Sequence, residues 1–309
     1  MAAAPPPPRG GQKPRSPSRP GLATAAADSA DASLAADDAT ALEEEEAEGA
    51  VIALGLTGSI GMGKSSVSAI LSALAVPVLD ADAVVHALYA PGGAAVAPVA
   101  AEFGDAALDP STGGVCRQRL SRLLGLANNA AAANTAAEKN SSSNSGGDGD
   151  GMRALERIVH PLVAAERRAF LRECARKGEK LAALDVPLLF ETGGHDDVDA
   201  VAVVSAPLEE QRRRVLARPG MTPEKFEAIL SRQVPDEEKR RRAHFVIDTG
   251  VAMSETERAV RAMVAALRRG EASMAALAEG GCSSPSALVI VQEWRLEEVR
   301  MRRRRRREE

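Results

Sequence analysis

The chain has 309 residues, with 39 lysines and arginines against 43 aspartates and glutamates and a formal net charge of −4. This balance excludes a global positive field for nucleic acid, and no stretch reaches the roughly 18 uncharged apolar residues that cross a membrane, so neither is expected as a partner. The three cysteines are odd in number and far apart in sequence, which argues against a disulfide framework and favours a reducing compartment such as the cytoplasm.

Residues 1–49 are of low complexity, with prolines and scattered basic residues followed by an alanine and aspartate stretch that ends in four glutamates. Such a segment buries too little apolar area to offset its ordering entropy, so a disordered extension is predicted. The first 27 residues hold basic but no acidic side chains, as organelle transit peptides do, although the prolines interrupt any amphipathic helix. A transit peptide and a plain extension are both open interpretations.

A phosphate-binding loop is the most informative motif in the sequence. Residues 58–65 fit the pattern G-x-x-x-x-G-K-[ST], in which glycines let backbone N–H groups turn toward an anion. Lys64 supplies a positive charge and Ser65 a hydroxyl that can ligate Mg²⁺. Residues 51–57 are typical of a buried strand and residues 66–74 have helical spacing, which is the context that the motif requires. The sequence therefore predicts a nucleotide site formed by Gly58, Ile60, Gly61, Met62, Gly63, Lys64, Ser65 and Ser66.

Two aspartates follow the second predicted strand. Residues 76–79 are typical of a short strand, which ends in Asp80-Ala81-Asp82 and leads into a helix. Carboxylates at the C-terminal end of such a strand lie where an open α/β sheet binds phosphates. The turn into the helix should aim them differently, with one facing the nucleotide and the other capping the helix. Two capping residues are the alternative.

Strands and helices alternate along the rest of the chain. Further strands are predicted at 181–186, 201–205 and 245–248, and the last two flank an arginine-rich helical stretch at 209–242. This alternation predicts an α/β fold with five mostly parallel strands covered on both faces. Pro161 indicates a break or kink in the helical pattern between residues 152 and 174.

Composition also marks the domain boundaries. The folded domain is expected to span residues 50–270, with a flexible low-complexity insertion at 125–151. Residues 271–309 are expected to form a tail outside the fold. It ends in six arginines and two glutamates, and such a basic run is usually solvated, with nucleic-acid binding or nuclear import as the less common use.

The order of these landmarks over residues 51–267 resembles dephospho-coenzyme A kinase. The resemblance is carried by residues 56–65, Asp80 to Asp82 with His86, Pro91 with Gly92, Phe103 with Gly104, Arg117 with Leu120, His160 to Leu162, residues 186–191, Arg218, Gln233 and residues 246–248. The motifs D-A-D, H-P-L and P-L-L-F-E in this order are much more specific than a phosphate-binding loop alone. The resemblance implies a three-layer P-loop nucleoside-triphosphate kinase fold with a lid and a small helical acceptor-binding subdomain.

The resemblance also implies a reaction. The family phosphorylates the ribose 3′-hydroxyl of dephospho-coenzyme A with ATP and Mg²⁺, the last step of coenzyme A biosynthesis. It implies that Asp82 accepts the hydroxyl proton while Lys64 and Arg218 stabilise the transferred group, with Arg214 as the second arginine for ATP. The acceptor-substrate residues would be Asp80, His86, Arg117, His160 and Pro187, with Asp80 as second choice for the base or as a ligand of Mg²⁺-bound water. Asp185, where a Walker-B-type acid could sit, ranks below Asp82.

Two departures from the family pattern bear on substrate binding. The insertion at 125–151 lies inside what resembles the helical coenzyme A domain, and Thr249 stands where the family often has asparagine.

The alternative functions are another P-loop nucleoside or nucleotide kinase and a nucleotide-regulated binding protein. A monomer is expected, with weak oligomerisation as the alternative.

Overall fold

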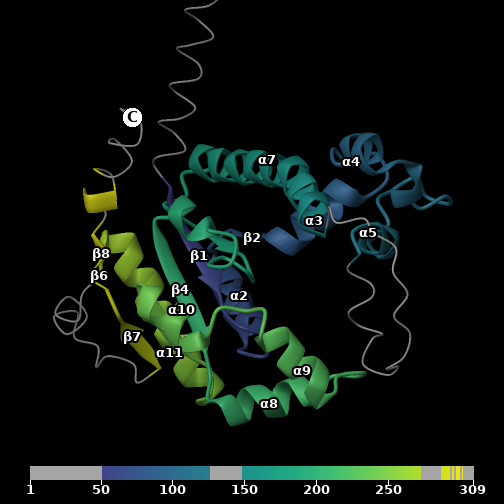
Figure 1. The fold of residues 1–309 in the computed structure, drawn as a ribbon. Coiled ribbons are helices and arrows are strands. Elements are labelled where there is room, and N and C mark those ends of the chain that lie inside the picture. Colours follow the sequence, from purple (N-terminus) through teal and green to yellow (C-terminus); the bar gives the residue numbers. More distant parts are fainter. Residues whose placement is uncertain are drawn as a thin grey trace, which may run out of the picture. The chain divides into compact units, whose positions relative to one another are not determined.

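The structure, a computed structural model, describes residues 51–125, 148–272, 287–292, 294–295, 297–299 and 301 (Figure 1). The expectations for residues 1–49, for most of the insertion and for the arginine run at 302–307 lie outside the described residues. Among those described, no helix is long and apolar enough to span a membrane.

A six-stranded sheet forms the centre of the fold. Its strands are β1 (Ile52–Thr57), β2 (Val78–Asp80), β3 (Leu181–Asp185), β4 (Ala200–Ser205), β5 (Phe245–Asp248) and β7 (Leu288–Ile290), in the order β2-β3-β1-β4-β5-β7. The first five are parallel to their neighbours, and β7 is antiparallel to β5. The predicted α/β class is confirmed, but the predicted number of five strands is one short.

Helices pack on the sheet and beside it. They are α2 (Lys64–Ala73), α3 (Ala81–Tyr89), α4 (Val96–Phe103), α5 (Arg117–Leu123), α7 (Asp148–Arg176), α8 (Leu208–Leu216), α9 (Pro223–Leu230), α10 (Asp236–Arg242) and α11 (Met253–Arg269). Short 3₁₀ helices lie at Asp105–Ala107 and Gly194–Asp197. A side-chain cap fixes the start of α9: Thr222 accepts a hydrogen bond from the backbone N–H of Lys225 at 3.3 Å, and Pro223 follows it at the first position of the helix.

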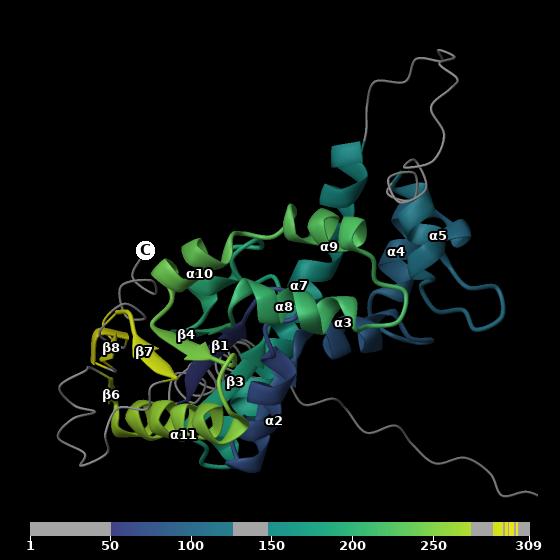
Figure 2. The ribbon, with the colours of Figure 1, turned by 90° about the horizontal axis from the view of Figure 1, so that it is seen from below.

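The two faces of the sheet are buried under different helices (Figure 2). Leu54 and Leu56 of β1 belong to a core that also contains side chains of α2 and α11. Ala53, the residue before Leu54, packs on the opposite face with Leu171 of α7. Successive residues of a strand point to opposite faces, so strands buried on both sides are continuously apolar, as the sequence pattern indicated.

A smaller core lies among the helices that follow β2. Leu88 of α3, Val99 of α4 and Leu120 of α5 are buried together, and Leu155 of α7 packs against them. This cluster is distinct from the cores on the sheet. It forms a small helical subdomain of the kind that the resemblance implied.

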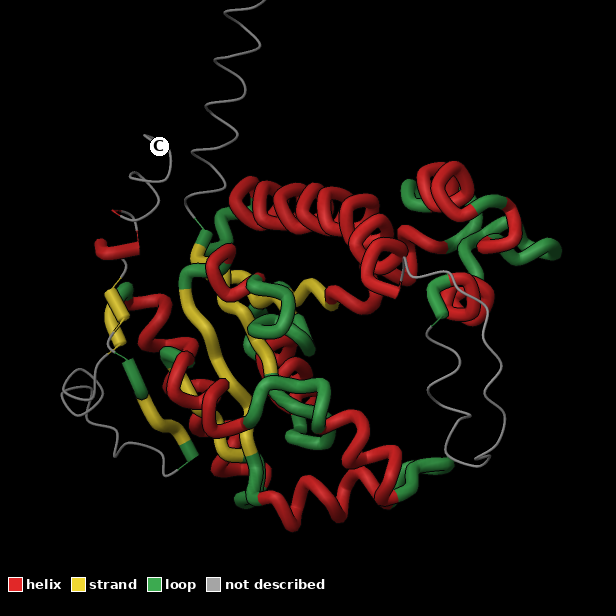
Figure 3. The backbone as a smooth tube through the Cα atoms, in the orientation of Figure 1, coloured by secondary structure: helices red, strands yellow, loops and turns green. Residues whose placement is uncertain are grey.

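Helix α7 differs from its prediction at two points. It is continuous through Pro161, so of the predicted break or kink the break is wrong and only a kink is compatible with the structure (Figure 3). A proline inside a helix removes one backbone hydrogen bond, and the long flanking helical segments tolerate this loss. The helix also begins at Asp148, so residues 148–151 are helical and do not belong to the insertion.

The segment after α11 takes part in the fold, contrary to the expectation for residues 271–309. Strand β7 pairs with β5, and a two-stranded sheet joins β6 (Glu271–Ala272) to β8 (Trp294–Arg295). Trp294 is 1% exposed, and its indole Nε1 donates a hydrogen bond to the carbonyl of Asp199 at 2.8 Å. Residues 287–291 form a continuous apolar run rich in β-branched side chains, so a signal for β7 was present in the sequence and the prediction overlooked it.

Candidate functional site

The phosphate-binding loop connects β1 to α2, as predicted. Gly61 and Gly63 have φ angles of +79° and +87°, in the left-handed region that favours glycine. A Cβ atom on Gly61 would lie 2.4 Å from Cγ2 of Val215, and one on Gly58 would lie 2.7 Å from the carbonyl oxygen of Val204. Glycine is therefore required both for the turn and for the close packing of the loop against α8 and β4.

A cavity of about 1040 Å³ opens beside this loop. Predicted site residues from five parts of the chain line it: Gly58, Ile60, Gly61, Met62, Gly63, Lys64 and Ser65 of the loop, Asp82 of α3, His160 of α7, Pro187 after β3, and Arg218 after α8. Much of the remaining wall is apolar and comes from α3, α7 and the segment after β3. Five other predicted residues are not part of the wall: Ser66, Asp80, His86, Arg117 and Arg214.

The two aspartates after β2 have separate roles. Asp80 caps α3, because its Oδ1 accepts hydrogen bonds from the backbone N–H groups of Asp82 at 2.9 Å and Ala83 at 3.2 Å. Asp82, in the first turn of α3, is exposed at the cavity wall. The structure thus matches the interpretation in which one aspartate caps the helix and the other faces the site.

Lys64 forms an ion pair with Asp185. Its Nζ contacts Oδ1 of this aspartate, which is 4% exposed at the C-terminal end of β3. Asp185 pairs with Asp80 across strands β2 and β3, so the strand ends bring the two acids together. From the sequence, Asp185 ranks below Asp82 as a functional acid. Its position at the end of an apolar strand was the signal that could have indicated its contact with Lys64.

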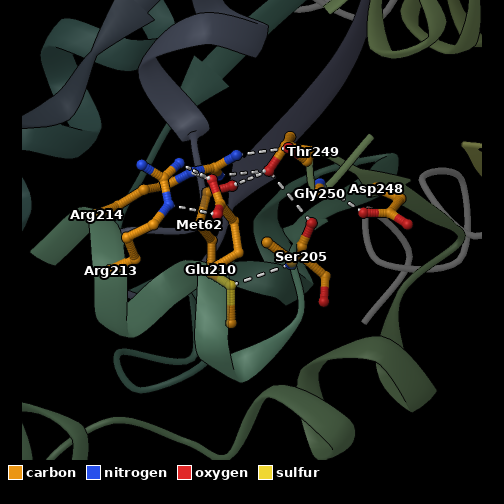
Figure 4. Close-up of polar contacts among 9 residues, drawn as sticks. Met62, Ser205, Glu210, Arg213, Arg214, Asp248, Thr249 and Gly250 are labelled. Carbon is orange, nitrogen blue, oxygen red and sulfur yellow. Dashed lines mark hydrogen bonds and ion pairs between the residues drawn. The ribbon is translucent and has the colours of Figure 1, made fainter. Parts of the chain in front are cut away.

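Arg214 is not part of the cavity wall, and its guanidinium group contacts Thr249 and Glu210 (Figure 4). Its Nη1 and Nη2 donate to Oγ1 and the carbonyl of Thr249 at 3.0 and 2.6 Å, and its Nε donates to Glu210 at 2.7 Å. A hydrogen bond from Arg213 and a further one from Arg214 lower the pKa of Glu210 to about 2, which keeps its carboxylate charged. Thr249 in turn donates its hydroxyl to the carbonyl of Met62 at 2.6 Å.

Arg218 is placed differently from Arg214. It lies two residues after the end of α8, is exposed, and lines the cavity. Within the described ranges, no hydrogen bond or ion pair holds its guanidinium group. Of the two predicted ATP-binding arginines, Arg218 is therefore the one that is free to reach a phosphate in the cavity.

The predicted acceptor-side residues are only partly brought together. The carbonyl of Pro187 accepts a hydrogen bond from Thr57 Oγ1 at 3.1 Å, which fixes the start of the P-L-L-F-E segment beside β1. His86 is exposed on α3 away from the wall. The guanidinium carbon of Arg117 lies 5.7 Å from the ring centre of Tyr89, and burial raises the pKa of that phenol, an effect that Arg117 partly offsets.

Two glutamines contact the loop, and sequence reasoning gave neither of them a role. Gln211 of α8 donates from Nε2 to the carbonyl of Ile60 at 2.7 Å, and Oε1 of Gln233 accepts from the backbone N–H of Ile60 at 3.2 Å. Gln233 was part of the family resemblance, whereas Gln211 lies in an arginine-rich helix that gave no signal.

A buried ion pair supports the segment that carries Gln233. Glu191, the last residue of P-L-L-F-E, lies 2.9 Å from Nζ of Lys239, whose side chain is fully buried. The same carboxylate accepts a hydrogen bond from the N–H of Val234 at 2.9 Å. Burial acts to raise the pKa of Glu191, but the bonds from Lys239 and Val234 outweigh it and lower the pKa below its usual value.

Comparison with known proteins identifies relatives of the chain. A family model described as dephospho-CoA kinase matches residues 52–134 and 148–255, and so ends before β7. The dephospho-CoA kinase of Novosphingobium aromaticivorans is 50% identical over 218 residues, which cover 70% of this chain and 94% of that protein. The one of Mesorhizobium japonicum is 47% identical over 219 residues, covering 71% of this chain and 98% of that protein. The crystal structure of TT1252 from Thermus thermophilus is 35% identical, with a TM-score of 0.53, over 70% of this chain and 97% of that one.

Proposed function

The chain belongs to the dephospho-CoA kinase family, and we infer from this that it transfers the γ-phosphoryl group of ATP to the ribose 3′-hydroxyl of dephospho-coenzyme A. The products are coenzyme A and ADP. The observation that best supports this proposal is the convergence of Lys64, Asp82 and Arg218 on one cavity. These three side chains supply the cation, the acceptor of the hydroxyl proton and the mobile positive charge that phosphoryl transfer needs.

The phosphates of ATP would bind at the loop, where backbone N–H groups and Lys64 balance their charge. Asp185 holds the ammonium group of Lys64 at the end of β3 and so restricts its position before ATP binds. Arg218 would move over the γ-phosphate, exclude water and stabilise the charge that develops during transfer. Asp82 would hold the acceptor hydroxyl in line with the phosphorus atom and take its proton.

The residues at the loop suit Mg²⁺. The hydroxyl of Ser65, in the first turn of α2, and the carboxylate of Asp185 at the end of β3 are oxygen donors, which this hard cation prefers. No group of three or more acidic, histidine or cysteine side chains among the described residues could hold a metal by itself. This fits a cation that is bound together with the nucleotide, because Mg²⁺ usually takes most of its ligands from phosphates and water. When bound, it would neutralise phosphate charge.

The acceptor would lie along α3, α7 and the segment after β3. This part of the cavity combines apolar side chains with His160 and Pro187. His160 is exposed on the helix, so we assign it to hydrogen bonding with the acceptor and leave the proton transfer to Asp82. His86 and Arg117 would contribute only if the helical subdomain moves when the acceptor binds.

A coupled assay tests the proposal directly. The purified chain is given ATP and Mg²⁺ with dephospho-coenzyme A, with AMP, or with no acceptor, and release of ADP is followed. Dephospho-coenzyme A should stimulate ADP release and give a product with a 3′-phosphate, which ³¹P NMR identifies. Equal or greater stimulation by AMP would reject the proposal in favour of a nucleotide kinase.

The proposal includes a monomeric enzyme in the cytoplasm. The unpaired Cys116 and Cys174 agree with a reducing compartment. Light scattering of the purified chain measures its mass in solution, and a mass of twice the chain would overturn the monomer.

A further inference from the structure

Two glutamines hold the backbone of Ile60 from opposite ends. The carbonyl oxygen of Ile60 accepts from Gln211 at 2.7 Å, and its N–H donates to Gln233 at 3.2 Å. The polarity of each bond is set by the backbone atom, so Gln211 must present its amide nitrogen and Gln233 its amide oxygen. The two bonds fix the two successive peptide groups that flank Ile60.

The bond from Gln211 also fixes the direction of the next N–H group. In a trans peptide the carbonyl oxygen of Ile60 and the N–H of Gly61 point in opposite directions within one plane. Gly61 has a φ angle of +79° and no side chain, so rotation of this peptide meets little steric resistance from the residue itself. The hydrogen bond from Gln211 therefore restrains a peptide group that glycine leaves free to turn.

Both glutamines are held firmly. Gln211 is 2% exposed on α8, where the neighbouring Val215 packs against Gly61. Gln233 precedes Val234, whose N–H is bonded to Glu191, and Glu191 is paired with the fully buried Lys239. Gln211 and Gln233 lie at the two ends of residues 211–233, the part of the predicted lid that contains Arg218. Their hydrogen bonds to Ile60 therefore join the phosphate-binding loop to both ends of this segment.

We propose that Gln211 and Gln233 are positioning residues for phosphoryl transfer. By holding the peptide groups on both sides of Ile60, they set the direction of the Gly61 N–H and keep the phosphate-binding loop in one shape before ATP arrives. This inference rests on the proposed function, because the loop is taken to hold the phosphates of ATP during transfer.

The opposite polarity of the two bonds gives a sharp test. Gln233→Glu keeps an acceptor for the Ile60 N–H, whereas Gln233→Leu removes it. Gln211→Leu removes the donor, and Gln211→Glu places a carboxylate against the carbonyl of Ile60. Gln292→Leu is the matched control, since Gln292 also donates from Nε2 to a backbone carbonyl, that of Arg241, at 3.2 Å.

Amide hydrogen exchange of the nucleotide-free protein, resolved at Ile60, is the first measurement. Exchange should be faster in Gln233→Leu than in Gln233→Glu, and Gln292→Leu should match the unchanged protein. Equal exchange in the two Gln233 variants would overturn the proposal. Because this measurement needs no acceptor, it stands even if dephospho-coenzyme A is not phosphorylated.

Steady-state kinetics is the second measurement. Gln211→Leu should lower kcat about tenfold, the effect of losing one typical hydrogen bond, with little change in KM for dephospho-coenzyme A. Gln211→Glu should lower it further. If kcat falls only in step with the melting temperature, the glutamines are merely structural and the proposal fails. Gln233→Leu, at a less buried position, gives the same test should Gln211→Leu not fold.

Discussion

The two sides of the cavity are built in different ways. On the nucleotide side, the loop is braced by Thr249, Gln211 and Gln233, and Lys64 is paired with a buried acid. On the acceptor side, the predicted contacts Asp82, His86, Arg117 and His160 all have exposed side chains. If the proposed roles hold, we expect the nucleotide side to be largely formed before binding and the acceptor side to gain most of its contacts from the substrate itself.

Among the substitutions that test this difference between the two sides, Lys64→Ala should lower kcat the most. Lys64→Ala should lower kcat about a thousandfold, because a charge held in place toward the transferred phosphoryl group is lost. Steady-state assays measure kcat, with Lys177→Ala as control, because Lys177 is exposed just after the end of α7. If Lys64→Ala kept most of its kcat, the proposal that the nucleotide side is formed before binding around Lys64 would be wrong.

Substitution of Glu191 should destabilise the same side. Glu191→Gln leaves the fully buried Lys239 without its ionic partner, which should cost about 3 kcal/mol of the free energy of unfolding. The folded-state pKa of Glu191 is below its usual value of 4.5, so its stabilising contribution is full above that pH and is lost as the pH falls through the folded pKa.

Urea denaturation at pH 7 and at pH 4 checks this prediction. The difference between the unchanged protein and Glu191→Gln should shrink at the lower pH. Glu173→Gln, which alters an exposed pair on α7, should change little at either pH. If the difference in the free energy of unfolding increased toward acid pH, the lowered pKa of Glu191 would be contradicted.

Substitution of Asp82 tests the acceptor side. Asp82→Asn should lower kcat about a hundredfold, within the usual contribution of a general base, while ATP binding stays unchanged. Asp80→Asn is the matched control, because asparagine also caps helices well and should preserve the start of α3. A larger loss of kcat in Asp80→Asn than in Asp82→Asn would exchange the roles of the two residues.

Substitution of His160 should have the smallest effect. His160→Asn should raise KM for dephospho-coenzyme A about fivefold, through one weakened hydrogen bond, and leave KM for ATP unaltered. Initial-rate measurements with each substrate varied separate the two constants. An equal rise in both would remove His160 from the acceptor side.

Much of the fold could be predicted because it is encoded locally. The runs that became β1, β3, β4 and β5 are continuously apolar, and the loop motif carries its own strand and helix. Strand β7 was missed although residues 287–291 are also continuously apolar, because this short run stands alone in the sequence with no motif beside it, and its pairing with β5 becomes evident only in the fold.

Some residues of the candidate site could be predicted from the sequence, and others could not. Residues named from a motif, such as Lys64, lie where the motif requires, because backbone geometry places them. Arg214 was named as the second match to the family's lid arginine, but its guanidinium group is bonded to Glu210 and Thr249 and is not part of the cavity wall. Gln211 had no sequence signal, since its role depends on a backbone carbonyl 151 residues earlier that only the fold brings near.

The pairing of β7 with β5 has a consequence for synthesis of the chain. Every nucleotide-side residue discussed here precedes residue 250, yet the outer edge of β5 is unpaired until residues 288–290 have left the ribosome. An unpaired strand edge can pair with another chain. A nascent or shortened chain that ends near Gly270 would therefore contain every residue of the proposed catalytic set and still present an unpaired edge, so it should aggregate more readily than the full chain.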